Sequence, residues 1–115
     1  MATLSSHLLN SVDGTHASGV KVTINQINSL GVKKIFFETK TDDGGRILKD
    51  FELSNDDCGC DYEMVCKTAD YFSKKKIVSE IIIKFRMEDP KKKYHLPIII
   101  SPNGYSIWWL SLIHI

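Results

Sequence analysis

The chain has 115 residues, the size of a single domain. Hydrophobic residues make up 43% of it and charged residues 25%, which excludes the hydrophobic-poor, highly charged composition of a disordered chain. Fifteen lysines and arginines against 14 aspartates and glutamates leave a net charge of +1, so overall charge does not indicate a nucleic-acid or membrane partner.

No apolar stretch approaches the roughly 18–20 residues of a membrane-spanning helix, and the first residues lack the pattern of a secretory leader. Three cysteines cannot all pair within one chain, which favours reduced thiols. Cys58 and Cys60 could be half of a zinc site, but no second ligand pair follows. We therefore expect an intracellular protein, cytoplasmic or peroxisomal, that binds no metal.

Alternating apolar and polar residues predict β-strands along most of the chain. Val20, Val22 and Ile24 alternate with polar residues, as in a strand with one buried face. The longest pattern, 77–88, places alternate apolar residues starting at Ile77 on one face and charged residues on the other. In chain order, strands are predicted at 4–9, 20–25, 34–39, 46–51, 62–67, 77–88, 94–100 and 105–109.

Turn-forming residues separate these strands, and one short helix is predicted at 68–75. Thr68 would cap the start of this helix, while Lys74 and Lys75 suit its end. The segment 55–57, Asn-Asp-Asp, reads as one of the turns. Regular turns without a long helical pattern predict an all-β fold, a two-sheet sandwich of eight strands with one short helix.

Two histidines and one arginine are unusual for a simple sandwich. His7 and His95 each interrupt an apolar strand, and Arg46 opens a strand after two glycines. Each could be an ordinary surface or core residue. If the sheet gathers them, the imidazoles could act as general bases and the guanidinium could hold an anionic or amide-rich ring. Pro97 lacks a backbone N–H, which predicts an edge or a bulge in that strand.

Four ordered segments carry a resemblance to a known family. They are LSSHLLNSVDGTHASGVKV, TDDGGRIL, YEMVCKTADYFSKK with SEIIIKF, and KYHLPIIISPNGYS. Together they resemble the 5-hydroxyisourate hydrolases, the enzyme branch of the transthyretin family, from about residue 4 to 106. The resemblance implies a prealbumin-like sandwich of eight strands with one short helix, assembled as a homotetramer, a dimer of dimers. It also implies hydrolysis of 5-hydroxyisourate, a small molecule, in urate degradation without a cofactor.

The family's site residues carry over individually to His7 in SSHLLN, Arg46 in DGGRIL and His95 in YHLPIII. Transthyretin carriers lack this set as a group, so its presence favours the hydrolase. By the resemblance, one histidine activates water and the other orients it or protonates the leaving nitrogen. Arg46, with His7, would hold the substrate. Which histidine acts as the base stays open.

The sequence departs from the family at its end, where the family has Tyr-Arg-Gly-Ser. Trp108 aligns with the tyrosine and Ser111 with the serine, so their contacts with substrate stay open. We interpret 1–109 as one domain and 110–115 as an atypical tail. The tail LSLIHI matches one reading frame of a sequencing adapter, and the alternative is a genuine divergence that makes the protein a non-catalytic binder of a flat aromatic ligand. The apolar end formed by 108–115 predicts a homo-oligomer.

Overall fold

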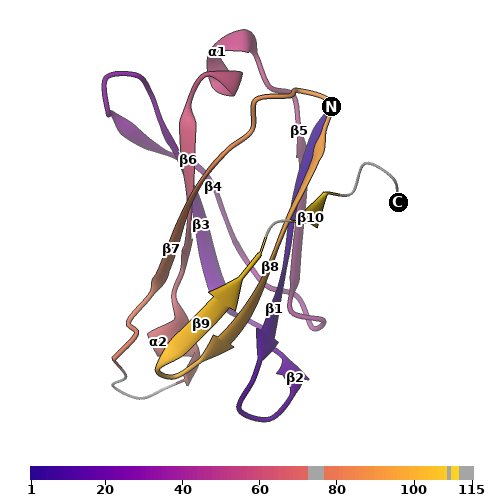
Figure 1. Ribbon diagram of the computed structural model, residues 1–115, viewed down its shortest axis with the longest axis vertical. Helices are drawn as coiled ribbons and strands as arrows, with labels where there is room; N and C mark the ends of the chain where they lie inside the picture. The colour runs from indigo at the N-terminus through magenta and orange to yellow at the C-terminus, as the bar shows by residue number, and fades with distance from the viewer. Residues whose placement is uncertain (73–76, 109, 112–115) are drawn as a thin grey trace.

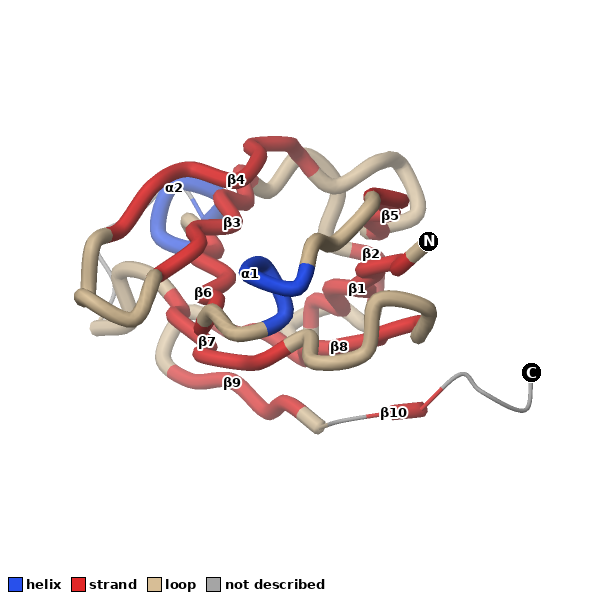
Figure 2. The backbone as a smooth tube through the Cα atoms, turned by 90° about the horizontal axis from the view of Figure 1, so that it is seen from above, coloured by secondary structure: helices blue, strands red, loops and turns tan. Residues whose placement is uncertain are grey.

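Two β-sheets packed face to face form the protein in the computed structural model, which describes residues 1–72, 77–108 and 110–111 (Figure 1). Seen from above, the sheets form two layers around a common interior (Figure 2). The first sheet contains β1 (Ala2–Asn10), β2 (Thr15–His16), β5 (Arg46–Phe51), β8 (Lys93–Ser101), β9 (Gly104–Ile107) and β10 (Leu110–Ser111). The second contains β3 (Lys21–Ile27), β4 (Lys33–Lys40), β6 (Asp61–Cys66) and β7 (Ile81–Arg86). The helices are α1 (Asn55–Cys58) and α2 (Thr68–Phe72).

Strand β1 lies in the middle of the first sheet. It runs parallel to β8 on one side and antiparallel to β5 and the short β2 on the other. The remaining strand pairs in the described residues are antiparallel, and the second sheet has the order β4-β3-β6-β7. The parallel pairing brings the first and the last long strands of the chain together.

Apolar residues of alternate parity fill the space between the sheets. Leu4 and Leu8 of β1 are fully buried, as are Ile98 and Ile100 of β8, and Ile24 of β3 in the other sheet belongs to the same core cluster. Because side chains alternate across a strand, burying the even positions of β1 turns its odd positions to the outer face. The core therefore fixes which face of β1 is available for a site.

All eight predicted strands are present, although the boundaries of some differ. The predicted strand 77–88 begins only at Ile81, where pairing with β6 starts, and Ile77 is 90% exposed rather than on the buried face. The two-residue strands β2 and β10 were not predicted. The helix begins at Thr68 as expected, but the buried Thr68 hydroxyl has no hydrogen-bond partner among the described residues, so the predicted cap is wrong. The described part of the helix ends at Phe72, whereas Lys74, Lys75 and residue 109 lie outside the described residues.

The predicted turn at 55–57 is instead the helical turn α1. Ser54 caps it, because its hydroxyl accepts a hydrogen bond from the Asp57 amide while the Asp57 carboxylate accepts one from the Ser54 amide. Neither α1 nor α2 is long and apolar enough to cross a membrane, nor is any other helix of the described residues.

Strand β8 pairs with β1 on one side and with β9 and β10 on the other. Among the residues that the structure describes, it is therefore an edge at Pro97 and the residue before it, and only on the side away from β1. Its register with β1 runs past Pro97 without a shift, which makes the predicted bulge wrong on that side. On the other side, β10 pairs with Tyr94 and His95 and β9 starts at Ile98. Within the described strands, Leu96 and Pro97 thus fall in the interval between these two pairings, where a missing N–H costs no ladder bond.

Candidate active site

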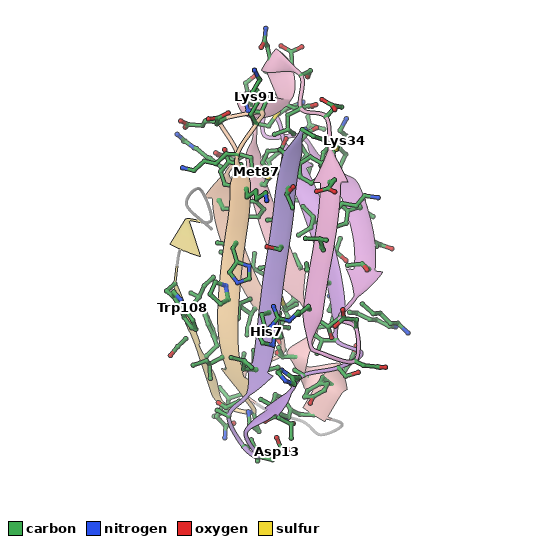
Figure 3. The ribbon with its side chains drawn as sticks, turned by 90° about the vertical axis from the view of Figure 1, so that its right-hand side faces the viewer. His7, Asp13, Lys34, Met87, Lys91 and Trp108 are labelled. Carbon is green, nitrogen blue, oxygen red and sulfur yellow. The ribbon has the colours of Figure 1, made fainter. Side chains whose placement is uncertain are left out.

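The three residues singled out in the sequence lie on the same face of three adjacent strands. In the β1–β5 register His7 is opposite Arg46, and in the β1–β8 register Ser5 is opposite His95. His7 and Ser5 are two residues apart on β1 and therefore point to the same, outer face. Figure 3 looks onto this sheet, with His7 on β1 between β8 and β5.

A tight loop before β5 fixes the start of the strand that carries Arg46. The Asp42 carboxylate accepts hydrogen bonds from the backbone amides of Gly44 and Arg46, each at 2.9 Å. Gly45 has φ of +72°, a left-handed conformation that glycine adopts without strain. Its carbonyl accepts a 2.8 Å hydrogen bond from the amide of Leu8. The loop therefore ties the Arg46 backbone to β1, one residue from His7.

His95 is held by the hydroxyl of a buried serine. Its Nδ1 lies 2.8 Å from Oγ of Ser5, whose residue is 8% exposed although it belongs to the outer face. Burial, and then the positive charge of Arg46, lower the pKa of His95 below its ordinary value of 6.5. Near neutral pH, His95 is thus predominantly an uncharged imidazole.

His7 has a second histidine as its partner. Nε2 of His7 lies 2.8 Å from Nδ1 of His16, and the two ring centroids are 4.9 Å apart. Burial lowers the pKa of His7, followed by the charges of Arg46 and His16, and only an interaction with the Gly44 backbone opposes them. Like His95, His7 is mainly neutral near pH 7.

A shallow cleft of about 400 Å³ lies beside these residues. Its lining includes Arg46 and His95 together with Ser5, Asp42 and Leu48. The cleft therefore combines a cation, a neutral imidazole and a carboxylate with an apolar side chain. This is a mixture that can bind a small, polar ring and supply a base next to it.

Of the two doubtful substrate contacts, Trp108 lies in a different depression, whereas Ser111 lies on the strand that pairs with β8 at His95. Trp108 lines a mainly apolar depression of about 430 Å³ formed by residues of β7, β8 and β9, among them Phe85 and Ile107. Ser111 belongs to β10 and pairs with Tyr94, next to His95 along β8. The part of the tail that follows Ser111 lies outside the described residues.

Ser5 and His16 are the site neighbours that sequence reasoning missed. Ser5 reads as an ordinary polar residue of a strand, and only the register with β8 brings it to His95. The signal for His16 was stronger, since the Asp13-Gly14 turn predicts that the chain folds back on β1. A hairpin argument would have placed His16 near His7.

Comparison with known proteins agrees with this architecture. The family model described as the HIUase/Transthyretin family matches residues 4–109. The chain is 32% identical over 108 residues to a 5-hydroxyisourate hydrolase of Salmonella dublin, covering 91% of this chain and 78% of that protein. It is 28% identical over 112 residues to a 5-hydroxyisourate hydrolase of Halalkalibacterium halodurans, covering 91% of this chain and 94% of that protein.

A solved structure is similar in both sequence and fold. The structure of Klebsiella pneumoniae 5-hydroxyisourate hydrolase has a TM-score of 0.78 and 26% identity, covering 96% of this chain and all of that one. The two-sheet sandwich with a parallel β1–β8 pair therefore defines a transthyretin-like protein. The chain belongs to the HIUase/transthyretin family, as its sequence motifs predicted.

Proposed function

We propose that this protein hydrolyses 5-hydroxyisourate to 2-oxo-4-hydroxy-4-carboxy-5-ureidoimidazoline, a step of urate degradation. The observation that carries the proposal is the shared outer face of His7, Arg46 and His95 on three adjacent strands. The similarity to proteins named 5-hydroxyisourate hydrolase supports the same reaction. The cleft is of a size suited to a single small ring.

Arg46 would bind the substrate and stabilise the charge that forms during the reaction. The substrate ring is rich in carbonyl groups and is anionic, and a planar guanidinium can donate two parallel hydrogen bonds to such a group. When water attacks the ring carbonyl, negative charge develops on the carbonyl oxygen. The same cation then stabilises the transition state more than the ground state.

His95 is the better candidate for the general base. If its Nδ1–H donates to Oγ of Ser5, then Nε2 carries the lone pair that can take a proton from water. The lowered pKa of His95 supports this role, because the base must be uncharged when it acts. His95 also lines the cleft with Arg46. The water proton would thus move to Nε2 as the water oxygen bonds to the carbonyl carbon.

His7 would then serve the other half of the reaction. The carbon–nitrogen bond of the ring breaks as the tetrahedral intermediate collapses, and the leaving nitrogen must gain a proton. His7 is opposite Arg46 in the β1–β5 register and shares the outer face with His95, which supports a position within reach of the same substrate. His7 would orient the ring and, in its protonated form, donate a proton to this nitrogen, and the proton that His95 took from water would then restore the protonated form of His7.

We also propose that the active form is a homotetramer, a dimer of dimers. Leu48 beside the cleft is 72% exposed, and Trp108 is 43% exposed in the apolar depression. Large apolar side chains exposed at these two separate places favour burial against another subunit. Light scattering combined with gel filtration should give four times the mass of one chain, and a monodisperse monomer would refute the proposal.

The decisive experiment follows the decay of 5-hydroxyisourate, generated from urate in situ, by ultraviolet absorbance with and without the protein. The wild-type chain should accelerate the decay. His95→Ala and His7→Ala should each lower turnover at least about a hundredfold, the low end of general acid–base catalysis. Thr39→Ala on the other sheet is the matched control and should retain activity. Decay no faster than the spontaneous rate would reject the proposed reaction.

The same assay can examine the tail. A chain whose residues after 106 are replaced to end in Tyr-Arg-Gly-Ser should be more active if segment 110–115 is a replaced end rather than part of the native domain. Equal activity of the two chains would count against that interpretation of the tail.

A further inference from the structure

His16 is a fourth ionisable group beside the three that the family motifs supply. It follows the turn at Asp13 and Gly14, and its strand β2 pairs with β1 so that His16 is opposite Leu9. Leu9 and His7 have the same parity on β1, so this register directs the His16 ring to the outer face.

The turn before His16 is well defined by hydrogen bonds. The Asp13 carboxylate accepts one from the Thr15 amide at 3.0 Å and another from the Thr15 hydroxyl at 2.6 Å. Gly14 has φ of +75°, and its amide donates to the carbonyl of Asn10. Beyond His16, the amide of Ala17 donates to the carbonyl of Leu8, and Ala17 is fully buried. The position of His16 is therefore anchored on both sides.

The contact between the two rings limits their protonation. With Nε2 of His7 and Nδ1 of His16 2.8 Å apart, one nitrogen must donate its proton and the other must accept it. Two protonated rings would direct two N–H groups at each other. The pair can therefore keep this contact with no positive charge or with one, but not with two.

We propose that His16 is a positioning residue for His7: the two rings hold one proton between them, which fixes the His7 ring and restricts the pair to a single positive charge. The role in hydrolysis rests on the proposed function, whereas the coupling of the two rings does not. His16 is exposed, so it can exchange this proton with water. The pair thus connects a partly buried site imidazole to solvent.

The other positively charged or ionisable groups around His7 also lower its pKa, and the Asp42 carboxylate in the adjoining loop is already hydrogen-bonded. Arg46 is opposite His7 on β5, and His95 lies on the same outer face of β8, opposite Ser5. Both disfavour the protonated form of His7, as His16 does from β2. The Asp42 carboxylate of the loop before β5 accepts hydrogen bonds from two backbone amides, those of Gly44 and Arg46. Removing the His16 ring should therefore raise the pKa of His7.

The experiment is an NMR titration of the His7 ring in the full-length wild type, His16→Ala and His16→Asn. Asparagine can keep a hydrogen bond near the Nδ1 position but cannot carry the charge. The pKa of His7 should rise in both variants. Thr15→Ala is the control: it removes the hydroxyl hydrogen bond to Asp13 but keeps the amide one that holds the turn, so it should leave the His7 titration unchanged.

Hydrolysis supplies the second readout. His16→Ala should lower kcat roughly three- to tenfold, the effect of one lost hydrogen bond, and His16→Asn should restore most of it at pH 8. The limb of the pH profile set by His7 should move to higher pH in both variants. An unchanged His7 titration in His16→Ala would refute the coupling. A wild-type chain without hydrolase activity would refute the proposed reaction and the role of His16 in it, and the titration would still decide whether the rings are coupled.

Discussion

Gly45 is the residue whose replacement should most clearly separate backbone geometry from side-chain chemistry at the site. A Cβ at this position would lie 2.5 Å from the carbonyl oxygen of Leu8 and 3.0 Å from the amide nitrogen of Ala17. Both are backbone atoms that cannot rotate away. In addition, φ of +72° costs a residue with a Cβ about 1–2 kcal/mol. Relieving the overlap by moving the backbone should add about 1–3 kcal/mol.

Gly45→Ala should therefore lower the free energy of unfolding by about 2–5 kcal/mol, a large part of the ~5–15 kcal/mol typical of a domain. Gly44→Ala is the matched control, because the φ of Gly44 is not positive and the atom nearest to the added Cβ would be an oxygen of the Asp42 carboxylate, at 3.4 Å. The control should change stability by only about 0.5 kcal/mol.

Urea unfolding at one fixed protein concentration measures both effects, since association would make the midpoint depend on concentration. Gly45→Ala should also lower kcat/KM, because the loop that it distorts aligns Arg46 with His7. Coincident urea midpoints for the two variants would show that the close approach of Gly45 to β1 does not constrain the loop.

Three further predictions concern the site. Arg46→Lys keeps the positive charge but loses the planar guanidinium that can donate two parallel hydrogen bonds, so KM should rise about tenfold in steady-state assays. An unchanged KM would argue against such a bidentate contact. Ser5→Ala should lower kcat roughly three- to tenfold and alter the tautomer of His95 seen by ¹⁵N NMR, whereas a wild-type spectrum would exclude a positioning role for Ser5. Because the pKa values of His7 and His95 are lowered in the folded state, the unfolded chain binds protons first as the pH falls below about 6.5. Unfolding free energy from urea titrations should thus decrease on acidification until the folded pKa values are passed, and His95→Gln should reduce this dependence.

The strands and the three site residues could be predicted from sequence because both leave local signals. Alternation identified all eight longer strands, and the buried faces of Val22 and Ile24 follow it. His7 and His95 stood out as polar interruptions of apolar runs. The predicted start of the strand 77–88 was wrong because an alternating pattern can also occur in an exposed segment outside a sheet. Ile77 continues the alternation of 81–87 in sequence, but no described neighbouring strand pairs with it, and it is exposed.

Contacts between strands could not be predicted in the same way, because they depend on register. Ser5 contacts His95, which is 90 residues away in the sequence, and no local pattern around either residue predicts this contact. α1 was missed for a related reason: Asn, Asp and Asp favour turns, and the helix depends on the reciprocal hydrogen bonds of Ser54 and Asp57. The same three residues suit a turn or a helical turn, and the hydrogen bonds that the backbone forms decide between the two.

The site and the core depend on the same register of β1. A shift of one residue would turn His7 and Ser5 inward and expose Leu4 and Leu8, both of which are fully buried. Each of those leucines contributes about 1.5–3 kcal/mol through burial, so the shifted register is strongly disfavoured. The hydrophobic core therefore selects the one alignment of β1 in which the histidine faces Arg46 and the serine faces His95. Polar residues that contribute little to folding are in this way held in place by apolar residues on the opposite face of the same strand.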